Sequence, residues 1–321
     1  AITVTAVNDT PTLSLPTAQS TNEDTALFVT GISIADVDAG TGNMTVTLAV
    51  AQGSVTLDAE AASSVGVTIT TNGTNSVQLS GSVMGINMLL ATSNAVRYNP
   101  TLNYNGSDAL SVTVADGGNT GTGGTRSASG SVALTVNAIN DAPVNTVPVA
   151  QTTAEDTSRV IAGLSIADAD AASGSMTVTL AVGNGTLVVT GGTATIAGSG
   201  SATVTLTGTA AQINATLSAS NAVTYTPSAN YNGADTLTMT TSDGGNTGLG
   251  GVLTDIDTVA ISISAVNDAP VNTLPASLVT SEDTATALNG LSVTDVDAST
   301  GNITVTLTVL QGLSLIHISE P

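Results

Sequence analysis

One segment of about 130 residues recurs along this chain, and this tandem repeat constrains the fold more than any other feature of the sequence. The string Asn-Asp-x-Pro begins at Asn8, Asn140 and Asn267, with spacings of 132 and 127 residues. The strings Glu-Asp-Thr and Asp-x-Asp-Ala each occur three times at the same two spacings. A period of this kind indicates a row of similar modules.

The repeat predicts how the chain is divided. Two complete modules are predicted over residues 11–142 and 143–269, with the last strand of an upstream repeat over 1–10 and a truncated repeat over 270–312. We therefore expect the sequence to be a piece of a longer protein. Two later motifs, Tyr-Asn-Gly-x-Asp and Asp-Gly-Gly-Asn-Thr-Gly, recur only at a spacing of 127. The five-residue difference between the spacings must then fall between residues 53 and 94.

The last nine residues, 313–321, break the repeat pattern. They resemble the translation of a sequencing adapter, and we interpret them as an artefact and exclude them from functional reasoning. The alternative is a genuine strand with a buried histidine. His317, the only histidine, lies in this stretch, so its exclusion also removes any Ser-His-Asp triad or histidine metal site.

The residue pattern within a repeat predicts strands. Residues 176–182 alternate apolar and small polar side chains, as a half-buried strand does, and residues 202–207, 237–241 and 259–266 do likewise. Residues 209–217 are the exception, because Ile213 and Leu217 lie four apart and Thr209 can cap a helix. We therefore predict an all-β fold of sandwich modules, with one short helix in each repeat.

The charge of the chain excludes several classes of function. There are 24 acidic residues, three arginines and no lysine, which gives a net charge of −21. Such a chain has no basic patch for nucleic acid or for an anionic membrane surface. No apolar run is long enough to insert into a membrane, and the absence of cysteine excludes disulfides and thiolate metal sites. Disorder is not expected, because only 8% of the residues are charged and 41% are hydrophobic.

The acidic residues are confined to repeated positions, which hold 19 of the 24. Carboxylates clustered without lysine need a counter-ion, and Ca²⁺ suits them because it takes six to eight oxygen ligands with flexible geometry. The predicted calcium ligands are Asn8, Asp9, Glu23, Asp24, Asp36, Asp38, Asn140, Asp141, Glu155, Asp156, Asp168, Asp170, Asn267, Asp268, Glu282, Asp283, Asp295 and Asp297.

The expected site is a junction between modules. In an extended segment Asp168 and Asp170 point to one side, and Pro143 favours an extended linker before it. We expect Asn140 and Asp141 to lie where Glu155 and Asp156 of the following module can reach. The alternative is that the aspartates only form Asx turns beside glycine and proline.

Two other acidic motifs leave their role open. Asp235 in Tyr-Asn-Gly-Ala-Asp is either structural, with Tyr231 closing the end of the sandwich, or a ligand. Asp243 in Asp-Gly-Gly is either part of a turn or a ligand.

Taken together, the Asn-Asp-Ala-Pro linkers, Glu-Asp-Thr, Asp-Val-Asp-Ala, Asn-Tyr-Asn-Gly-x-Asp and Ser-Asp-Gly-Gly resemble the bacterial cadherin-like tandem repeats of large RTX-type adhesins, related to VCBS modules. The resemblance covers residues 1–312. It implies Ig-like (cadherin-like) β-sandwiches, secretion to the cell surface, and calcium at linkers held by Asp141, Glu155, Asp168 and Asp170. The cadherin Leu-Asp-Arg-Glu element and the RTX nonapeptide are both absent from this sequence.

These observations favour a calcium-stiffened extender of an extracellular adhesin involved in cell adhesion or biofilm. Its expected partners are the neighbouring repeats of the same chain, with cell-surface or matrix ligands bound through other regions. The alternative is that the modules themselves bind a partner or mediate homophilic adhesion. We do not expect an enzyme, because glycosidase-like carboxylate pairs usually work beside aromatic platforms and the chain has no tryptophan.

Overall fold

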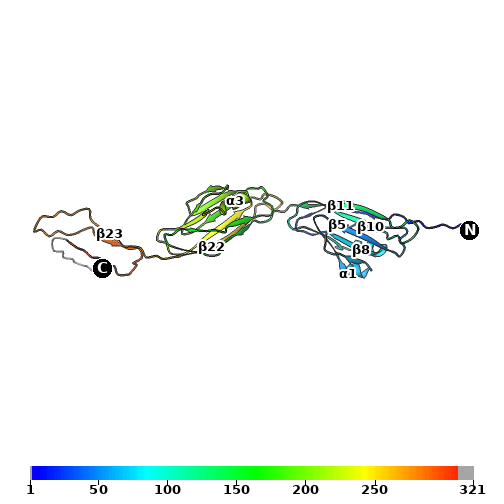
Figure 1. The fold of residues 1–321 in the computed structure, drawn as a ribbon, viewed down its shortest axis with the longest axis horizontal. Helices are drawn as coiled ribbons and strands as arrows, with labels where there is room; N and C mark the ends of the chain where they lie inside the picture. The colour runs from blue at the N-terminus through cyan, green and yellow to red at the C-terminus, as the bar shows by residue number, and fades with distance from the viewer. Residues whose placement is uncertain (1, 310–321) are drawn as a thin grey trace.

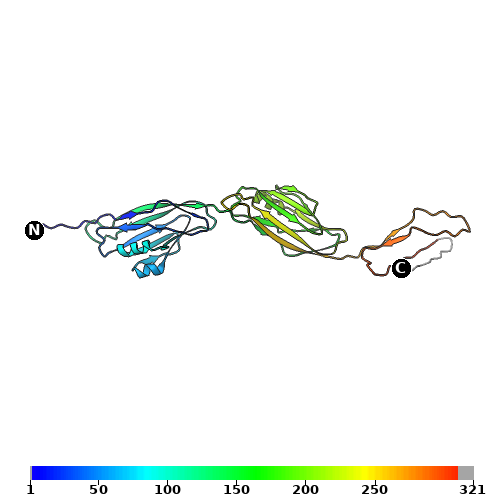
Figure 2. The same cartoon turned by 180° about the vertical axis from the view of Figure 1, so that it is seen from behind.

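A computed structural model describes residues 2–309 of the chain, so residues 313–321 with His317 lie outside the described part. Module 1 (11–142), module 2 (143–269) and a third unit (270–309) follow one another in a row, and the N-terminal segment extends from the outer end of module 1 (Figures 1 and 2). Within these residues no helix is long and apolar enough to cross a bilayer.

Module 1 is built from a large and a small sheet. The large sheet has the order β2 (Gln19–Asn22), β11 (Ser127–Asn137), β10 (Gly106–Ala115), β5 (Asn43–Ala49), β8 (Ser76–Ser82) and β7 (Thr68–Thr70). The small sheet has the order β3 (Leu27–Phe28), β9 (Val96–Pro100) and β6 (Gly53–Leu57), and β1 (Thr12–Ser14) pairs with β4 (Ser33–Ala35). Two helices, α1 (Ala59–Ser64) and α2 (Val83–Ala91), complete the module.

Module 2 repeats this topology. Its large sheet has the order β13 (Gln151–Ala154), β22 (Thr254–Ser264), β21 (Gly233–Ser242), β16 (Met176–Ala181), β19 (Thr203–Gly208) and β18 (Thr195–Ala197). Its small sheet has the order β14 (Arg159–Val160), β20 (Val223–Pro227) and β17 (Gly185–Val189), and β12 (Val144–Thr146) pairs with β15 (Ser165–Ala167). The module has one helix, α3 (Ala210–Leu217), and the third unit contains β23 (Val271–Thr273) paired with β24 (Ser292–Thr294).

Each module has its own hydrophobic core between its sheets. Along β16, side chains alternate between buried and half-buried, which is the pattern expected of a strand with one face on the core. The largest fully buried side chains are tyrosines, Tyr98 in module 1 and Tyr225 in module 2. The two cores are separate clusters, so each module buries its apolar surface without help from its neighbour.

The helix predicted over residues 209–217 is confirmed. Thr209 caps α3 in a capping box, in which its hydroxyl accepts from the Gln212 backbone N–H and the Gln212 side chain accepts from the Thr209 backbone N–H. Module 1 departs from the prediction of one helix per repeat because α1 is additional. This helix, capped by Asp58, lies inside the interval that must hold the five-residue difference, and module 2 has a short Gly-containing loop there.

Within the large sheet of each module, the first and last strands in chain order lie side by side and run in the same direction. β2 pairs with β11 in parallel, with Gln19 opposite Leu134 and Asn22 opposite Asn137. β13 pairs with β22 in the same way. A residue that follows the first strand is therefore brought to the end of the module where the last strand leaves for the next linker.

Candidate cation site at the module junctions

The first junction consists of the end of module 1, linker 1 (138–142) and the start of module 2. The Glu23 side chain is only 3% exposed, and its Oε1 accepts a hydrogen bond of 2.6 Å from the Ile139 backbone N–H. On the other side, the Oδ2 of Asp170 accepts from the Asp141 backbone N–H. The linker is thus held by an acidic side chain from each module.

The Asp-x-Asp segment forms a tight turn that fixes one oxygen of its first aspartate. Asp168 Oδ1 accepts from the backbone N–H groups of Asp170 and Ala171, both at 2.8 Å. The counterparts Asp36 and Asp295 make the same pair of bonds. The Asx-turn interpretation therefore describes Oδ1 and leaves Oδ2 available for another partner.

Four buried oxygens at the first junction have no hydrogen-bond partner: Glu23 Oε2, Asn140 Oδ1, Asp141 Oδ2 and Asp168 Oδ2. They come from module 1, from the linker and from module 2. A fifth such atom, Asp36 Oδ2, is the counterpart of the Asp168 oxygen at the start of module 1. Burying an unpaired carboxylate oxygen is costly, so oxygens gathered in this way are suited to a cation.

The charges at the junction also favour a bound cation. Burial raises the pKa of the Asp141 carboxyl, and the negative charges of Asp170, Asp24, Glu23 and Asp168 raise it further. The pKa of Asp268 at the second junction is also raised, by burial and then by Asp297, Asp156, Glu155 and Asp295. Each linker aspartate therefore lies in a field of carboxylates that disfavours its own negative charge.

The predicted ligands separate into groups. The start of module 1 holds Asn8, Asp9, Asp36 and Asp38; the first junction holds Glu23, Asp24, Asn140, Asp141, Asp168 and Asp170; the second holds Glu155, Asp156, Asn267, Asp268, Asp295 and Asp297; and Glu282 and Asp283 are exposed on the third unit. Across residues 2–309, no group of three or more Asp, Glu, His or Cys side chains is arranged so that it could hold a metal ion by itself.

The expectation that Glu155 and Asp156 reach Asn140 and Asp141 is wrong. Glu155 Oε1 accepts from the Val266 backbone N–H, at the far end of module 2. β22 has 11 residues, so its two ends are roughly 30 Å apart. The parallel pairing of first and last strands explains the difference, because it carries the Glu-Asp pair to the downstream end of its own module. The partner of linker 1 is accordingly Glu23.

Sequence reasoning missed an asparagine at each junction. The Asn103 backbone N–H donates to Asp24 Oδ1 and that of Asn230 donates to Asp156 Oδ1. With its amide nitrogen turned towards them, the Asn230 side chain also reaches Asp156 Oδ2 at 3.3 Å and Asp268 Oδ2 at 3.2 Å. The only signal in the sequence was the recurrence of this asparagine before the Tyr-Asn-Gly motif.

Asp108 and Asp235 lie inside their modules and are fully engaged there. Asp235 accepts hydrogen bonds from the backbone N–H groups of Gly183, Asn184 and Thr236 and from the Tyr225 hydroxyl, which is 2.8 Å away. Burial alone would raise the pKa of Asp235, but these hydrogen bonds outweigh it and lower the pKa. The structural interpretation of this motif agrees with its geometry.

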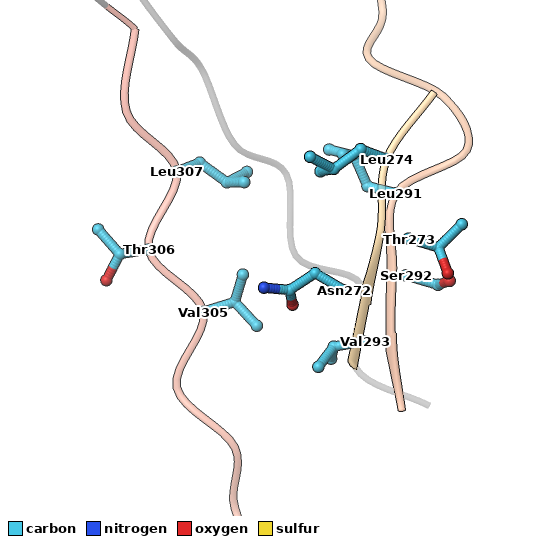
Figure 3. A pocket seen from close by; sticks show the side chains of 9 residues that line it. All are labelled: Asn272, Thr273, Leu274, Leu291, Ser292, Val293, Val305, Thr306 and Leu307. Carbon is cyan, nitrogen blue, oxygen red and sulfur yellow. The ribbon is translucent and has the colours of Figure 1, made fainter. Parts of the chain in front are cut away.

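A pocket of about 420 Å³ on the third unit is lined by three short segments, residues 272–274, 291–293 and 305–307 (Figure 3). Val305 and Leu307 project into it and are 53% and 39% exposed. Their counterparts in the repeat, Val178 and Leu180, are fully buried in the core of module 2. The pocket therefore corresponds to the inner face of a sandwich rather than to a ligand site.

Comparisons with known proteins concern the fold. Residues 197–261 match the family described as a bacterial Ig domain. Among solved structures, the extracellular cadherin domains 1–5 of protocadherin gamma B2 are 15% identical with a TM-score of 0.34, over 91% of this chain and 47% of that one. Mouse cadherin-23 EC22–24 is 18% identical with a TM-score of 0.35, over 82% of this chain and 69% of that one.

Human mucin-like protocadherin EC1–2 is 13% identical with a TM-score of 0.32, over 80% of this chain and 98% of that one. The chain spans about half the length of the protocadherin gamma B2 structure. No curated protein sequence matches the chain. The strand topology and the family match show that the modules are all-β, Ig-like sandwiches, as the sequence predicted.

Proposed function

We propose that this chain is a calcium-binding extender region of a secreted bacterial surface adhesin, in which calcium at each module junction stiffens a row of sandwiches. The observation that carries the proposal is the set of four buried, unpaired oxygens at the first junction. They belong to module 1, to linker 1 and to module 2, so one ion bound by them would connect the two modules.

The donor set fits calcium in its chemistry. Every candidate atom is a carboxylate or amide oxygen, and Ca²⁺ prefers such hard ligands in flexible arrangements. Zn²⁺ would favour histidine or cysteine, and Mg²⁺ would require a stricter octahedron. The residues that would hold the ion are Glu23, Asn140, Asp141 and Asp168, with Asp24 beside them.

The role of these residues is to couple neighbouring modules. Glu23 is rigid because its backbone N–H also bonds to the Asn137 carbonyl at the end of β11. Asp168 is rigid because its turn is closed by two backbone bonds. A cation bound between them supplies charge neutralisation and a direct link from module 1 to module 2. Without it, the clustered carboxylates repel one another and the linker can flex.

We propose a structural role rather than a catalytic one. Tyr98 and Tyr225 are buried in the cores, and Tyr104 and Tyr231 donate their hydroxyl hydrogen bonds to nearby backbone carbonyls. The extracellular location of the chain is part of the same proposal and is supported by the bacterial Ig domain match.

Small-angle scattering and thermal melts test the proposal together. In millimolar calcium the chain should be elongated and melt at a higher temperature, whereas chelator should broaden its distance distribution and lower the melting midpoint. Glu23→Gln should shift the calcium-bound profile towards the chelated one. Glu60→Gln is the matched control, because Glu60 is exposed on α1 outside the repeated positions.

Two results would contradict the proposal in different ways. Equal melting midpoints in calcium and in chelator would remove the calcium role. A rod that is equally stiff under both conditions, with melts that still depend on calcium, would place the ions within the sandwiches instead of at the junctions.

A further inference from the structure

The glycine-rich loop of each module contacts the linker that precedes the module. In module 2 this loop covers residues 243–252, and its Leu249 forms a parallel β-bridge with Ile139 of linker 1. The Asn140 backbone N–H donates to the Leu249 carbonyl at 2.9 Å, and the Leu249 N–H donates to the Ala138 carbonyl at 3.1 Å. The linker therefore adds to the loop as a short extra strand.

The side chain of Asn140 secures this contact. Its Nδ2 donates to Asp243 Oδ2 and to the Gly251 carbonyl, the latter at 2.9 Å. Asn140 and Asp243 are only 5% and 1% exposed. Asp243 is itself fixed, because its Oδ1 accepts from the Gly245 and Leu253 backbone N–H groups. A hydrogen bond to a buried, fixed carboxylate is among the stronger kinds in proteins.

Glycine is required where the loop and the linker meet. A Cβ atom built on Gly248 would lie 2.5 Å from the Asn140 backbone nitrogen and 2.6 Å from the Ile139 carbonyl carbon. The φ angle of Gly248 is +94°, which side-chain-bearing residues rarely adopt. The close approach therefore depends on this position having no side chain.

The same contact occurs at the start of module 1. Asn8 Nδ2 donates to Asp116 Oδ2 at 2.6 Å and to the Gly124 carbonyl at 2.8 Å. Thr122 makes the backbone bonds that Leu249 makes in module 2. Asn267, in linker 2 (265–269), is exposed, and among the described residues its side chain bonds only to the neighbouring Asp268 carbonyl.

We propose that this loop is a binding site for an extended Val/Ile-Asn-Asp segment, the linker of the upstream repeat, and that it holds the linker without metal. We call the paired Asn140–Asp243 and Asn8–Asp116 contacts the linker clamps. All the contacts described are between protein groups, so the clamp should hold the linker whether or not calcium is bound. The clamp also fixes Asn140 with its Oδ1 unpaired, so one candidate calcium ligand is already held in place without metal.

Hydrogen exchange of the whole chain in chelator tests the clamp. The Asn140 and Leu249 amides should exchange at least about tenfold more slowly than the Asn267 amide, since the first two are bonded in the clamp and Asn267 of linker 2 makes no such contact among the described residues. Asp243→Asn should abolish this protection while the loop keeps its Oδ1 bonds. Asp116→Asn, the matched variant, should release only Asn8 and Thr122.

A double variant separates the clamp from a general loss of loop structure. Asn140→Asp alone places a carboxylate against Asp243 and should also release the linker. The combination of Asn140→Asp with Asp243→Asn exchanges donor and acceptor and should restore much of the Asn140 protection. The proposal is overturned if Asn140 exchanges as fast as Asn267 in the unmodified chain, or if the double variant shows no recovery while core amides of β16 and β21 stay protected.

Discussion

The two linkers of this chain have similar sequences and different surroundings. Linker 1 contains Asn140, which is buried in the linker clamp, whereas linker 2 (265–269) contains Asn267, which is exposed. Both linkers nevertheless make the bond from the upstream module, from Ile139 to Glu23 and from Val266 to Glu155. The difference shows that a junction forms from two independent halves.

The upstream half of a junction is the bond between the linker and the glutamate of the preceding module, and it depends only on that module. Its glutamate is placed by the parallel pairing of first and last strands, and the same placement occurs in modules 1 and 2. The downstream half has two components. The Asp-x-Asp turn is present at both junctions, because Asp268 bonds to Asp297 as Asp141 bonds to Asp170. Among the described residues, the linker clamp is present at the linkers that precede modules 1 and 2.

The largest loss of stability should come from a substitution that destabilises one whole module, because the junctions on both sides of that module then lose a partner. Asp235→Ala leaves three backbone donors without their acceptor and leaves the buried Tyr225 hydroxyl with only the Asn184 carbonyl, and it should lower the free energy of unfolding of module 2 by about 3 kcal/mol. Asp108→Ala should do the same to module 1. Differential scanning calorimetry should show a separate transition shifting in each variant, and a shift of both transitions by either variant would contradict the independence of the two cores.

Glu23→Gln and Glu155→Gln compare the upstream halves. Calcium at a hundredfold excess over its dissociation constant stabilises a site by about 2.7 kcal/mol. Glu23→Gln should remove most of this calcium-dependent stabilisation at the first junction. Glu155→Gln should have a smaller effect, because linker 2 lacks the clamp. Melts of each variant with and without calcium measure the difference, and equal losses would show that the clamp does not contribute to calcium affinity.

Asp58→Ala tests whether a local change in module 1 reaches the junction. The Asp58 side chain caps α1 by accepting from the Glu60 and Ala61 backbone N–H groups, so its loss should cost about 1 kcal/mol. Calcium affinity, measured by titration calorimetry, should stay unchanged. A changed affinity would mean that α1 and the junction are coupled.

The smallest effect on stability is expected from a change of pH, and this effect should differ between the two junctions. The folded-state pKa values of Asp141 and Asp268 are raised, so metal-free protein should gain stability as the pH falls from 7 towards about 4, the pKa of an unfolded aspartate. The pKa values of Asp116 and Asp243 are lowered, because hydrogen bonds outweigh the effect of burial. Their contribution is present above about pH 4 and is lost below it.

The clamped linker should therefore gain and then lose protection on acidification, which hydrogen exchange as a function of pH can follow. Linker 2, which has no clamp among the described residues, should not show this loss of protection at low pH. Protection of Asn140 that rises steadily down to pH 3 would contradict the role of the Asp243 carboxylate.

The fold could be predicted from the sequence where a local pattern decides it. The alternation over residues 176–182 appears as β16, and the Thr209 cap appears at the start of α3. Helix α1 was not predicted, because its six residues include only one buried side chain, Ala62, and show no helical apolar period.

Which residues meet at each junction could be predicted from the sequence only in part. The linker residues follow from the repeat, but the favoured interpretation placed Asp168 and Asp170 in an extended segment, and the structure instead has the Asx turn that was the alternative. The choice of Glu23 over Glu155 could not be predicted, because it depends on the parallel pairing of β2 with β11 across more than 110 residues of sequence. No local pattern carries that information. The same holds for Asn140, whose partner Asp243 is 103 residues away.

The pairing of β2 with β11 also determines how a module responds to a pulling force. Tension transmitted along the row enters a module through the linker before it and leaves through the linker after it (Figure 1). Because the two strands are parallel, their loaded ends lie at opposite ends of the pair, and tension slides one strand along the other. The rungs of the ladder from Gln19–Leu134 to Asn22–Asn137 are then loaded in shear together instead of being unzipped one at a time. A tether built of such modules resists extension at the strands where it is pulled.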